Sequence, residues 1–201
     1  FYKKCIKCTF QTQFPGYEDL EGRIIIMKFD DITLVTVYAP NSGTNYENKI
    51  KFNDKMYNFL DKTTGKVILC GDLNAAKETH FDQSKCEPGP GTFPHELKLL
   101  KDLEFINFID TINCDTVYTW WDPRQVKENG MSRARNRNKG WRLDYFFTKN
   151  INHGSSKCLK YIGENNEGIP LASDHAPVIL DWEEGNRGEH ATLGSHFSAT
   201  V

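Results

Sequence analysis

The chain has 201 residues, of which 26% are charged and 38% hydrophobic, and its formal net charge is −2. This composition is that of a soluble globular protein with one hydrophobic core. The small net charge excludes attraction to nucleic acid by the charge of the whole protein, so any such attraction must come from a local group of basic residues. The longest apolar runs are far too short to cross a membrane.

The first half of the chain alternates β-rich runs with a helical pattern. Its predicted elements are a hairpin of strands over 23–29 and 32–39 joined at Asp30-Asp31, a loop over 40–43, an amphipathic helix over 46–60 and a buried strand over 66–70. The strand runs directly into Gly71, which allows the backbone to turn sharply.

The second half begins with a Gly- and Pro-rich loop. Its predicted elements are a loop over 79–93, a helix over 94–105 opened by Pro94, an extended stretch over 117–121, a polar and basic loop over 122–139, strands over 142–148, 158–162 and 176–182, and a polar tail over 183–201 without periodicity. We expect the tail to be disordered. Strands interspersed with helices and hairpins predict a layered α/β sandwich with antiparallel or mixed sheets.

Six cysteines are scattered along the chain and no Asn-x-Ser/Thr acceptor occurs. This usage is typical of a reduced, intracellular protein more than of a disulfide framework. The spacing Cys5-x-x-Cys8 suits zinc or redox chemistry, but no second pair of ligands accompanies it. A metal role for this pair is therefore not favoured.

The stretch Gly71-Asp72-Leu73-Asn74, at the end of a buried strand, is the most informative in the chain. A carboxylate and a carboxamide two residues apart at a strand end can hold a divalent cation, take a proton, or orient water and phosphate oxygens. The alternative is a simple Asx turn, which Asp and Asn often form after Gly. The tetrapeptide alone does not decide between the two.

Three further groups of residues bear on this choice. Tyr38 and Asn41 end a strand and begin a loop; in isolation they are a half-buried Tyr and a turn Asn. Asp144 lies in an otherwise apolar strand, where an acid must be paired, for instance in a structural ion pair with Arg142. Asp174-His175 comes immediately before an apolar strand.

Together these residues form a set suited to phosphodiester hydrolysis. Carboxylates can hold Mg²⁺ or Mn²⁺, and an Asp can accept the proton of an attacking water. A His held by a buried Asp can stay charged and bind the phosphate, while Tyr and Asn donate neutral hydrogen bonds to its oxygens.

The order Tyr-x-Pro-Asn, Gly-Asp-Leu-Asn, Gly-Trp-Arg-Leu-Asp-Tyr and Ser-Asp-His resembles the exonuclease III-like abasic-site DNA endonucleases of the endonuclease/exonuclease/phosphatase superfamily. The resemblance extends from about residue 21 to residue 182. It implies a four-layer α/β sandwich of the DNase I-like kind, of which residues 1–182 supply mainly the C-terminal half.

The resemblance also implies a role for each matching residue. The implied catalytic residues are Tyr38, Asp72, Asn74, Asp144 and His175, with Asp144 orienting His175. The implied contacts to phosphate or DNA are Tyr38, Asn41, Arg135, Arg142 and His175. The implied metal ligands are Asp72, Asn74, Asp174 and His175. A pocket for a flipped-out abasic sugar is implied at Trp120, Trp141 and Leu143, although the two Trp residues alone suggest core aromatics.

Basic residues are concentrated over 124–142, where the sequence has seven Lys or Arg and one Glu. Such runs are usually solvated loops, but beside an active site they suit binding of a DNA backbone. The loop is longer than the resemblance leads us to expect.

The implied activity is Mg²⁺-dependent hydrolysis of the phosphodiester 5′ to an abasic site in base-excision repair, with 3′-phosphodiesterase and 3′–5′ exonuclease activity in some relatives. The implied substrate is double-stranded DNA, cut by a monomer in the nucleus, a DNA-containing organelle or a bacterial cytoplasm. Alternatives are another phosphoesterase of the superfamily, such as a retroelement endonuclease or a phosphatase, or a DNA-binding remnant without catalysis.

One motif that the resemblance requires is absent. No Gln-Glu-x-Lys occurs in the chain, although its Glu is implied as a principal metal ligand. We therefore expect the N-terminal part of the domain to lie before Phe1. We also expect the chain by itself to leave sheet edges uncovered and to be a poor nuclease.

Overall fold

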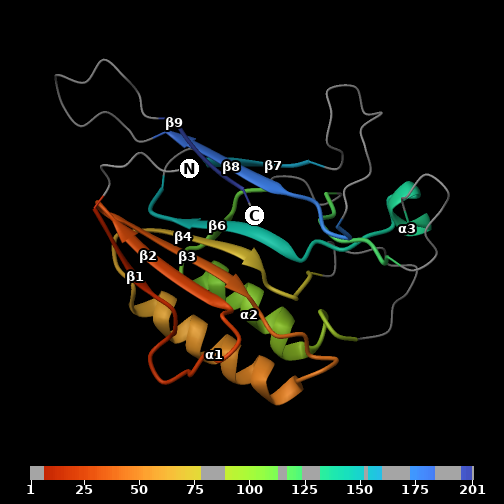
Figure 1. Cartoon of the computed structure of the whole chain (residues 1–201), viewed down its shortest axis with the longest axis horizontal. Coiled ribbons are helices and arrows are strands. Elements are labelled where there is room, and N and C mark those ends of the chain that lie inside the picture. Colours follow the sequence, from red (N-terminus) through yellow and green to blue (C-terminus); the bar gives the residue numbers. More distant parts are fainter. Residues whose placement is uncertain are drawn as a thin grey trace.

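The computed structural model describes residues 7–77, 89–112, 117–123, 132–151, 154–159, 173–183 and 196–200. These residues form two β-sheets and accompanying helices (Figure 1). The first sheet has six strands in the order β1 (Cys8–Gln11), β2 (Ile24–Phe29), β3 (Ile32–Tyr38), β4 (Lys66–Asp72), β6 (Asp144–Lys149) and β5 (Ile109–Asp110). The second sheet has the order β7 (Gly154–Cys158), β8 (Val178–Glu183) and β9 (His196–Thr200).

The first sheet is mixed because one of its connections is a crossover. β3 and β4 are parallel and are joined by α1 (Tyr46–Lys62), whereas the other pairings in the sheet are antiparallel. The predicted hairpin is confirmed: Phe29 pairs with Ile32, and Asp30 takes a positive φ of 49° in the two-residue turn. This geometry is that of the tight turns that match the twist of paired strands.

Both predicted helices are confirmed within two residues. α1 begins after Asn45, whose side chain accepts a hydrogen bond from the Asn48 backbone N–H, as an N-cap should. Its side chains Phe52, Met56 and Leu60 recur every four residues and are buried. α2 (Pro94–Phe105) has Pro at its first position, where the missing N–H costs nothing.

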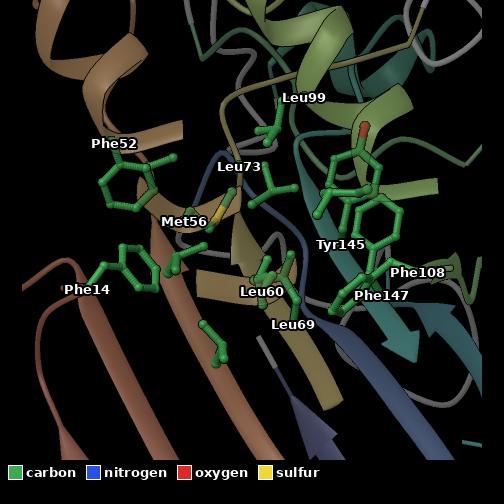
Figure 2. Close-up of a cluster of buried hydrophobic side chains, with 14 of the residues drawn as sticks. Phe14, Phe52, Met56, Leu60, Leu69, Leu73, Leu99, Phe108, Tyr145 and Phe147 are labelled. Carbon is green, nitrogen blue, oxygen red and sulfur yellow. The ribbon is translucent and has the colours of Figure 1, made fainter. Parts of the chain in front are cut away.

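Two hydrophobic clusters divide the molecule into three layers. The larger cluster lies between the helices and the first sheet; Figure 2 shows Phe52 and Met56 from α1 with Leu69, Tyr145 and Phe147 from the sheet. The smaller cluster lies between the two sheets, with side chains such as Ile68, Phe146 and Leu180. The fold is therefore mixed α/β, and the described elements account for three layers of the expected four-layer sandwich.

The structure differs from the sequence prediction in several elements. Strands β1 and β5 were not predicted. Of the strand predicted over 158–162, residues 160–162 lie outside the described ranges, and β7 (Gly154–Cys158) meets it only at Cys158. A short helix α3 (Arg133–Asn136) lies in the part of the predicted basic loop that the structure describes. In the tail expected to be disordered, His196–Thr200 pairs with β8 as strand β9. A strand edge offers unpaired N–H and C=O groups that any backbone can bind, so pairing does not require an apolar pattern.

None of the helices that the structure describes is both long and apolar enough to cross a lipid bilayer.

Candidate active site

Three of the predicted site residues lie in one row across neighbouring strands. Tyr38 at the end of β3 pairs with Asp72 at the end of β4, and Asp72 pairs with Asp144 at the start of β6. Directly paired residues of a sheet point to the same face. The strand pairing thus brings a phenol and two carboxylates together at one end of the first sheet.

Gly71 is needed where β4 approaches β3 closely. Its φ is +125°, and a Cβ atom at this position would lie 1.9 Å from the Val37 carbonyl oxygen. Asn74 takes a φ of 44°, and its backbone N–H donates to Asp72 Oδ1 at 2.7 Å. The Asx turn considered as the simple alternative is therefore present, and it is also what fixes the Asp72 carboxylate.

The side chain of Asn74 joins this turn to the loop after β3. Its Nδ2 donates to the Ala39 carbonyl oxygen at 2.9 Å and to Asp72 Oδ2 at 3.1 Å, while its Oδ1 accepts from Asn41 Nδ2 at 3.2 Å. Asn74 is 7% exposed. The structure thus brings Asn41, Asn74 and Asp72 into one hydrogen-bonded group.

Tyr38 is the exposed member of the row, with 56% of its surface accessible. The Arg23 guanidinium lies 4.8 Å from its ring centroid and donates to its carbonyl oxygen at 3.2 Å. A phenol on the surface beside two carboxylates can donate a hydrogen bond to a ligand oxygen.

Asp144 holds His175 across the two sheets. His175 Nδ1 lies 2.8 Å from Asp144 Oδ2, and the carboxyl group is buried. Burial disfavours the imidazolium, but the hydrogen bond and the charge of Asp144 outweigh it and raise the pKa of His175 above its ordinary value. Asp144 thus orients the ring and favours its protonated, positively charged form.

The pKa of Asp72 is raised to about 7, first by burial and then by the neighbouring charge of Asp144. The Asn74 backbone N–H and the positive charges of His175 and Lys49 oppose this shift without cancelling it. A carboxylate with a pKa near neutrality can accept a proton from water and release it again.

The loop that carries His175 is held by Arg135 from α3. Its guanidinium donates to the carbonyl oxygens of Ser173 at 2.8 Å and His175 at 3.0 Å, and it lies 4.5 Å from the ring centroid of Trp121. Arg135 is 4% exposed. We expected Arg135 to contact DNA; the structure instead buries it as a support for the His175 loop.

Arg142 also differs from the expected contact to DNA. It is 1% exposed, and its guanidinium donates to Asp110 Oδ2 at 3.1 Å and to the Val117 carbonyl oxygen at 3.0 Å. A buried guanidinium must be bonded within the protein, so the side chain is turned inward. The sequence alone allowed an ion pair between Arg142 and Asp144. In the structure Arg142 pairs with Asp110, and Asp144 binds His175.

The three residues of the predicted sugar pocket lie together. The rings of Trp120 and Trp141 meet edge to face with centroids 6.5 Å apart. Gly91 lies against both Trp141 and Leu143, since a Cβ atom built there would be 2.9 Å and 3.9 Å from them. Trp120 Nε1 donates to Asp174 Oδ2 at 2.8 Å, which attaches the aromatic pair to the His175 loop.

The predicted metal ligands do not make a complete site. Asn74 and His175 Nδ1 are engaged in the hydrogen bonds described above, and one oxygen of Asp174 is bound to Trp120. Within the described ranges no three His, Cys, Asp or Glu side chains are grouped as they would be around a cation. Asp72 and the second oxygen of Asp174 are the donors that fit best; a Mg²⁺ ion held by one or two carboxylates takes its remaining oxygen ligands from water and phosphate.

Sequence reasoning missed Thr119. Its buried Oγ1 accepts from the backbone N–H groups of Leu143 and Asp144, each at 3.0 Å, and its carbonyl oxygen accepts from Ala176 N–H at 2.7 Å. Thr119 thereby sets the start of β6 and the end of the His175 loop. A lone Thr in a short extended stretch carries no signal of this role.

Comparison with known proteins gives a consistent result. The model of the endonuclease/exonuclease/phosphatase family matches residues 1–175. The chain is 30% identical over 177 residues to an exodeoxyribonuclease of Bacillus subtilis, covering 81% of this chain and 64% of that protein. It is 30% identical over 175 residues to the DNA repair nuclease APEX1 of Danio rerio, covering 81% and 52%. The chain thus spans one half to two thirds of the length of these relatives.

Solved structures share the fold at lower sequence identity. An AP endonuclease from Archaeoglobus fulgidus is similar with a TM-score of 0.66 and 20% identity, over 86% of this chain and 70% of that one. A 3′ phosphatase from Neisseria, bound to a product DNA hairpin, gives 0.67 and 17%, over 88% and 79%. At these identities the likeness concerns the fold, which is of the AP endonuclease, DNase I-like kind.

Proposed function

The chain belongs to the endonuclease/exonuclease/phosphatase family, and we propose that it is part of a nuclease that hydrolyses the DNA phosphodiester 5′ to an abasic site. The observation that carries the proposal is the row in which Asp72 lies beside Asp144 while Asp144 holds His175 at 2.8 Å. It provides a carboxylate near neutral pKa and an oriented imidazole at one sheet end. Relatives named exodeoxyribonuclease and DNA repair nuclease support DNA as the substrate.

In the proposed reaction a water molecule attacks phosphorus and gives its proton to Asp72. The bond from phosphorus to the 3′ oxygen breaks, and this oxygen takes up a proton from bulk water to leave a 3′-hydroxyl, while Asp72 releases its proton to bulk water. His175, held in its charged form by Asp144, stabilises the negative charge on the phosphate oxygens. Tyr38 and Asn41 hold those oxygens by neutral hydrogen bonds. Asn74, whose amide donates to Ala39 and Asp72 and accepts from Asn41, keeps Asp72 and Asn41 in place.

Selection of an abasic site is proposed for Trp120, Trp141 and Leu143. A sugar without its base is small and relatively apolar, so it can enter a space where a complete nucleotide would clash. The edge-to-face Trp pair next to Asp174 supports such a space. The exposed Arg133 and Arg137 of the basic loop are suited to backbone phosphates.

Dependence on Mg²⁺ or Mn²⁺ is part of the proposal. Such a cation would neutralise charge on the phosphate. Since the described donors do not complete a site, we assign no step to the ion, and its requirement is tested by adding EDTA.

The test uses the 201-residue chain and a 5′-labelled duplex with one tetrahydrofuran abasic analogue, in Mg²⁺. We expect a single incision 5′ to the analogue, a product with a 3′-hydroxyl, and loss of cleavage in EDTA. An undamaged duplex and the Asp72→Ala variant are the controls. Equal cleavage of damaged and undamaged duplexes would contradict the abasic-site specificity.

DNA binding without hydrolysis is a second candidate, since the chain has no Gln-Glu-x-Lys motif to supply the Glu that the resemblance implies as a metal ligand. This candidate predicts no cleavage with or without Mg²⁺, together with binding that weakens steeply as salt rises. Filter binding of the same duplex at several salt concentrations separates it from the hydrolytic proposal.

A further inference from the structure

Two oppositely charged side chains are buried beneath the site and have no role in the proposed reaction. Lys49 lies in the first turn of α1 and Glu96 in the first turn of α2, and both are 0% exposed. Burying a charge is costly unless the group is hydrogen-bonded and compensated. The partners of these two side chains therefore indicate what their burial achieves.

Lys49 binds the turn that carries Asp72 and Asn74. Its Nζ donates to the Leu73 carbonyl oxygen, which lies between these two residues. The Leu73 N–H donates to the Leu143 carbonyl oxygen at 2.8 Å. The peptide groups on both sides of Leu73 are thus held, and this holds Asn74 in its left-handed conformation.

Glu96 binds the loop that carries Asn41. Its Oε1 accepts from Ser42 Oγ at 2.6 Å, and its Oε2 accepts from the Phe93 N–H at 2.8 Å. Ser42 directly follows Asn41 and is itself buried. Glu96 therefore caps its own helix with one oxygen and fastens the loop after β3 with the other.

The two supported segments meet in the site, because Asn41 Nδ2 donates to Asn74 Oδ1. The two supports also act on each other: burial lowers the pKa of Lys49 to about 8, while the charges of Glu96 and then Asp72 oppose this lowering. Removal of one charge would leave the other buried without its counterpart.

We propose that Lys49 and Glu96 are positioning residues of the hydrolytic site: Lys49 holds the Asp72–Asn74 turn and Glu96 holds the Asn41 loop in the geometry that the reaction needs. This inference rests on the proposed function. A purely structural role is the competing explanation: the two charges would then hold α1 and α2 in the fold without affecting turnover of the folded protein.

A single and a double variant distinguish these explanations. Lys49→Met removes the bond to Leu73 and leaves Glu96 uncompensated, so both turnover and the melting temperature should fall. Lys49→Met/Glu96→Gln removes the stranded charge and keeps an acceptor for Ser42, so the melting temperature should recover in part. Lys51→Met, on an exposed position of the same helix, is the matched control and should change neither quantity.

Positioning predicts that kcat on the abasic duplex falls about 100-fold in both the single and the double variant, because a misplaced contact group can cost that much. We expect KM to change by no more than about twofold, since the effect is on the reacting geometry. Recovery of kcat together with the melting temperature in the double variant would overturn the proposal.

A second measurement does not depend on hydrolysis. The side-chain amide resonances of Asn74 and Asn41 report their hydrogen bonds directly, and their exchange with solvent should be faster in Lys49→Met but unchanged in Lys51→Met. If the wild-type chain hydrolyses no substrate, the proposed function fails while this measurement still tests the positioning. Amide resonances in Lys49→Met that match those of the wild type would overturn the positioning role.

Discussion

The turn at Asp72–Asn74 and the loop at His175 form the two sides of the candidate site, and they are held in different ways. The turn is fixed mainly by its own short hydrogen bonds and by direct pairing with strand neighbours. The His175 loop is fixed by residues 31 to 40 positions away, namely Asp144 and Arg135. The turn thus starts from bonds between adjacent residues, to which distant groups such as Lys49 and Leu143 add support, whereas the His175 loop depends mainly on distant residues of the assembled fold.

The largest effect is expected at the turn. Asp72→Asn keeps the acceptor for the Asn74 N–H but removes the base, so kcat on the abasic duplex should fall about 1,000-fold or more. Single-turnover cleavage checks this, with Asp102→Asn on α2 as the control. If Asp72→Asn kept a tenth of the activity or more, another group would have to be the base.

On the other side of the site, Asp144→Asn should lower kcat about 100-fold. It removes the charge that raises the pKa of His175, so the protonated ring is lost at lower pH. The alkaline limb of the pH–rate profile should therefore move to lower pH, in step with the imidazole titration followed by NMR. If the alkaline limb of the pH–rate profile did not shift, the titration of His175 would not be what determines it.

A variant of Arg135 tests whether the position of the His175 loop depends on the hydrogen bonds that Arg135 donates to it. Arg135→Lys offers one ammonium group where a guanidinium reaches two carbonyl oxygens, so kcat should fall about tenfold. Lys101→Arg, at an exposed position of α2 away from the site, is the control and should leave kcat unchanged. Equal losses in both variants would show that the loss does not come from the hydrogen bonds of Arg135 to the His175 loop.

The smallest effect concerns stability and pH. Because the pKa of Asp72 is raised from 3.8 to about 7 in the folded state, its stabilising contribution is present at low pH and is lost between about pH 4 and pH 7. In EDTA, Asp72→Asn should therefore gain stability relative to wild type over this range, by on the order of 1 kcal/mol. Urea unfolding at several pH values measures the difference. If the free energy of unfolding changed with pH in the same way in wild type and variant, the prediction would be contradicted.

The sequence predicted the turn well because the determinants of the turn are adjacent residues. Gly71, Asp72 and Asn74 appear in order at the end of an apolar run, and the expected grouping with Asn41 and with Asp144–His175 is what the structure contains. The hairpin and both long helices were predictable for the same reason, since local periodicity and capping residues determine them.

Residues fixed by distant partners were not predictable. Arg142 follows Trp141 in a basic stretch, and only the position of Asp110, 32 residues earlier, shows that it is turned inward. Arg135 has the same appearance in the sequence and is covered by Trp121 and the His175 loop. The pairing of β9 with β8 uses backbone groups, which side-chain patterns do not report.

The row of Tyr38, Asp72 and Asp144 has a consequence for how the protein acquires activity. Successive side chains of a strand point to opposite faces, so a slip of one residue in either strand pair would turn a member of the row away from the others. A refolding chain whose helices have formed and whose core has collapsed would therefore still lack the assembled site. If the proposed hydrolysis holds, recovery of cleavage during refolding would report that the three strands have reached their native alignment.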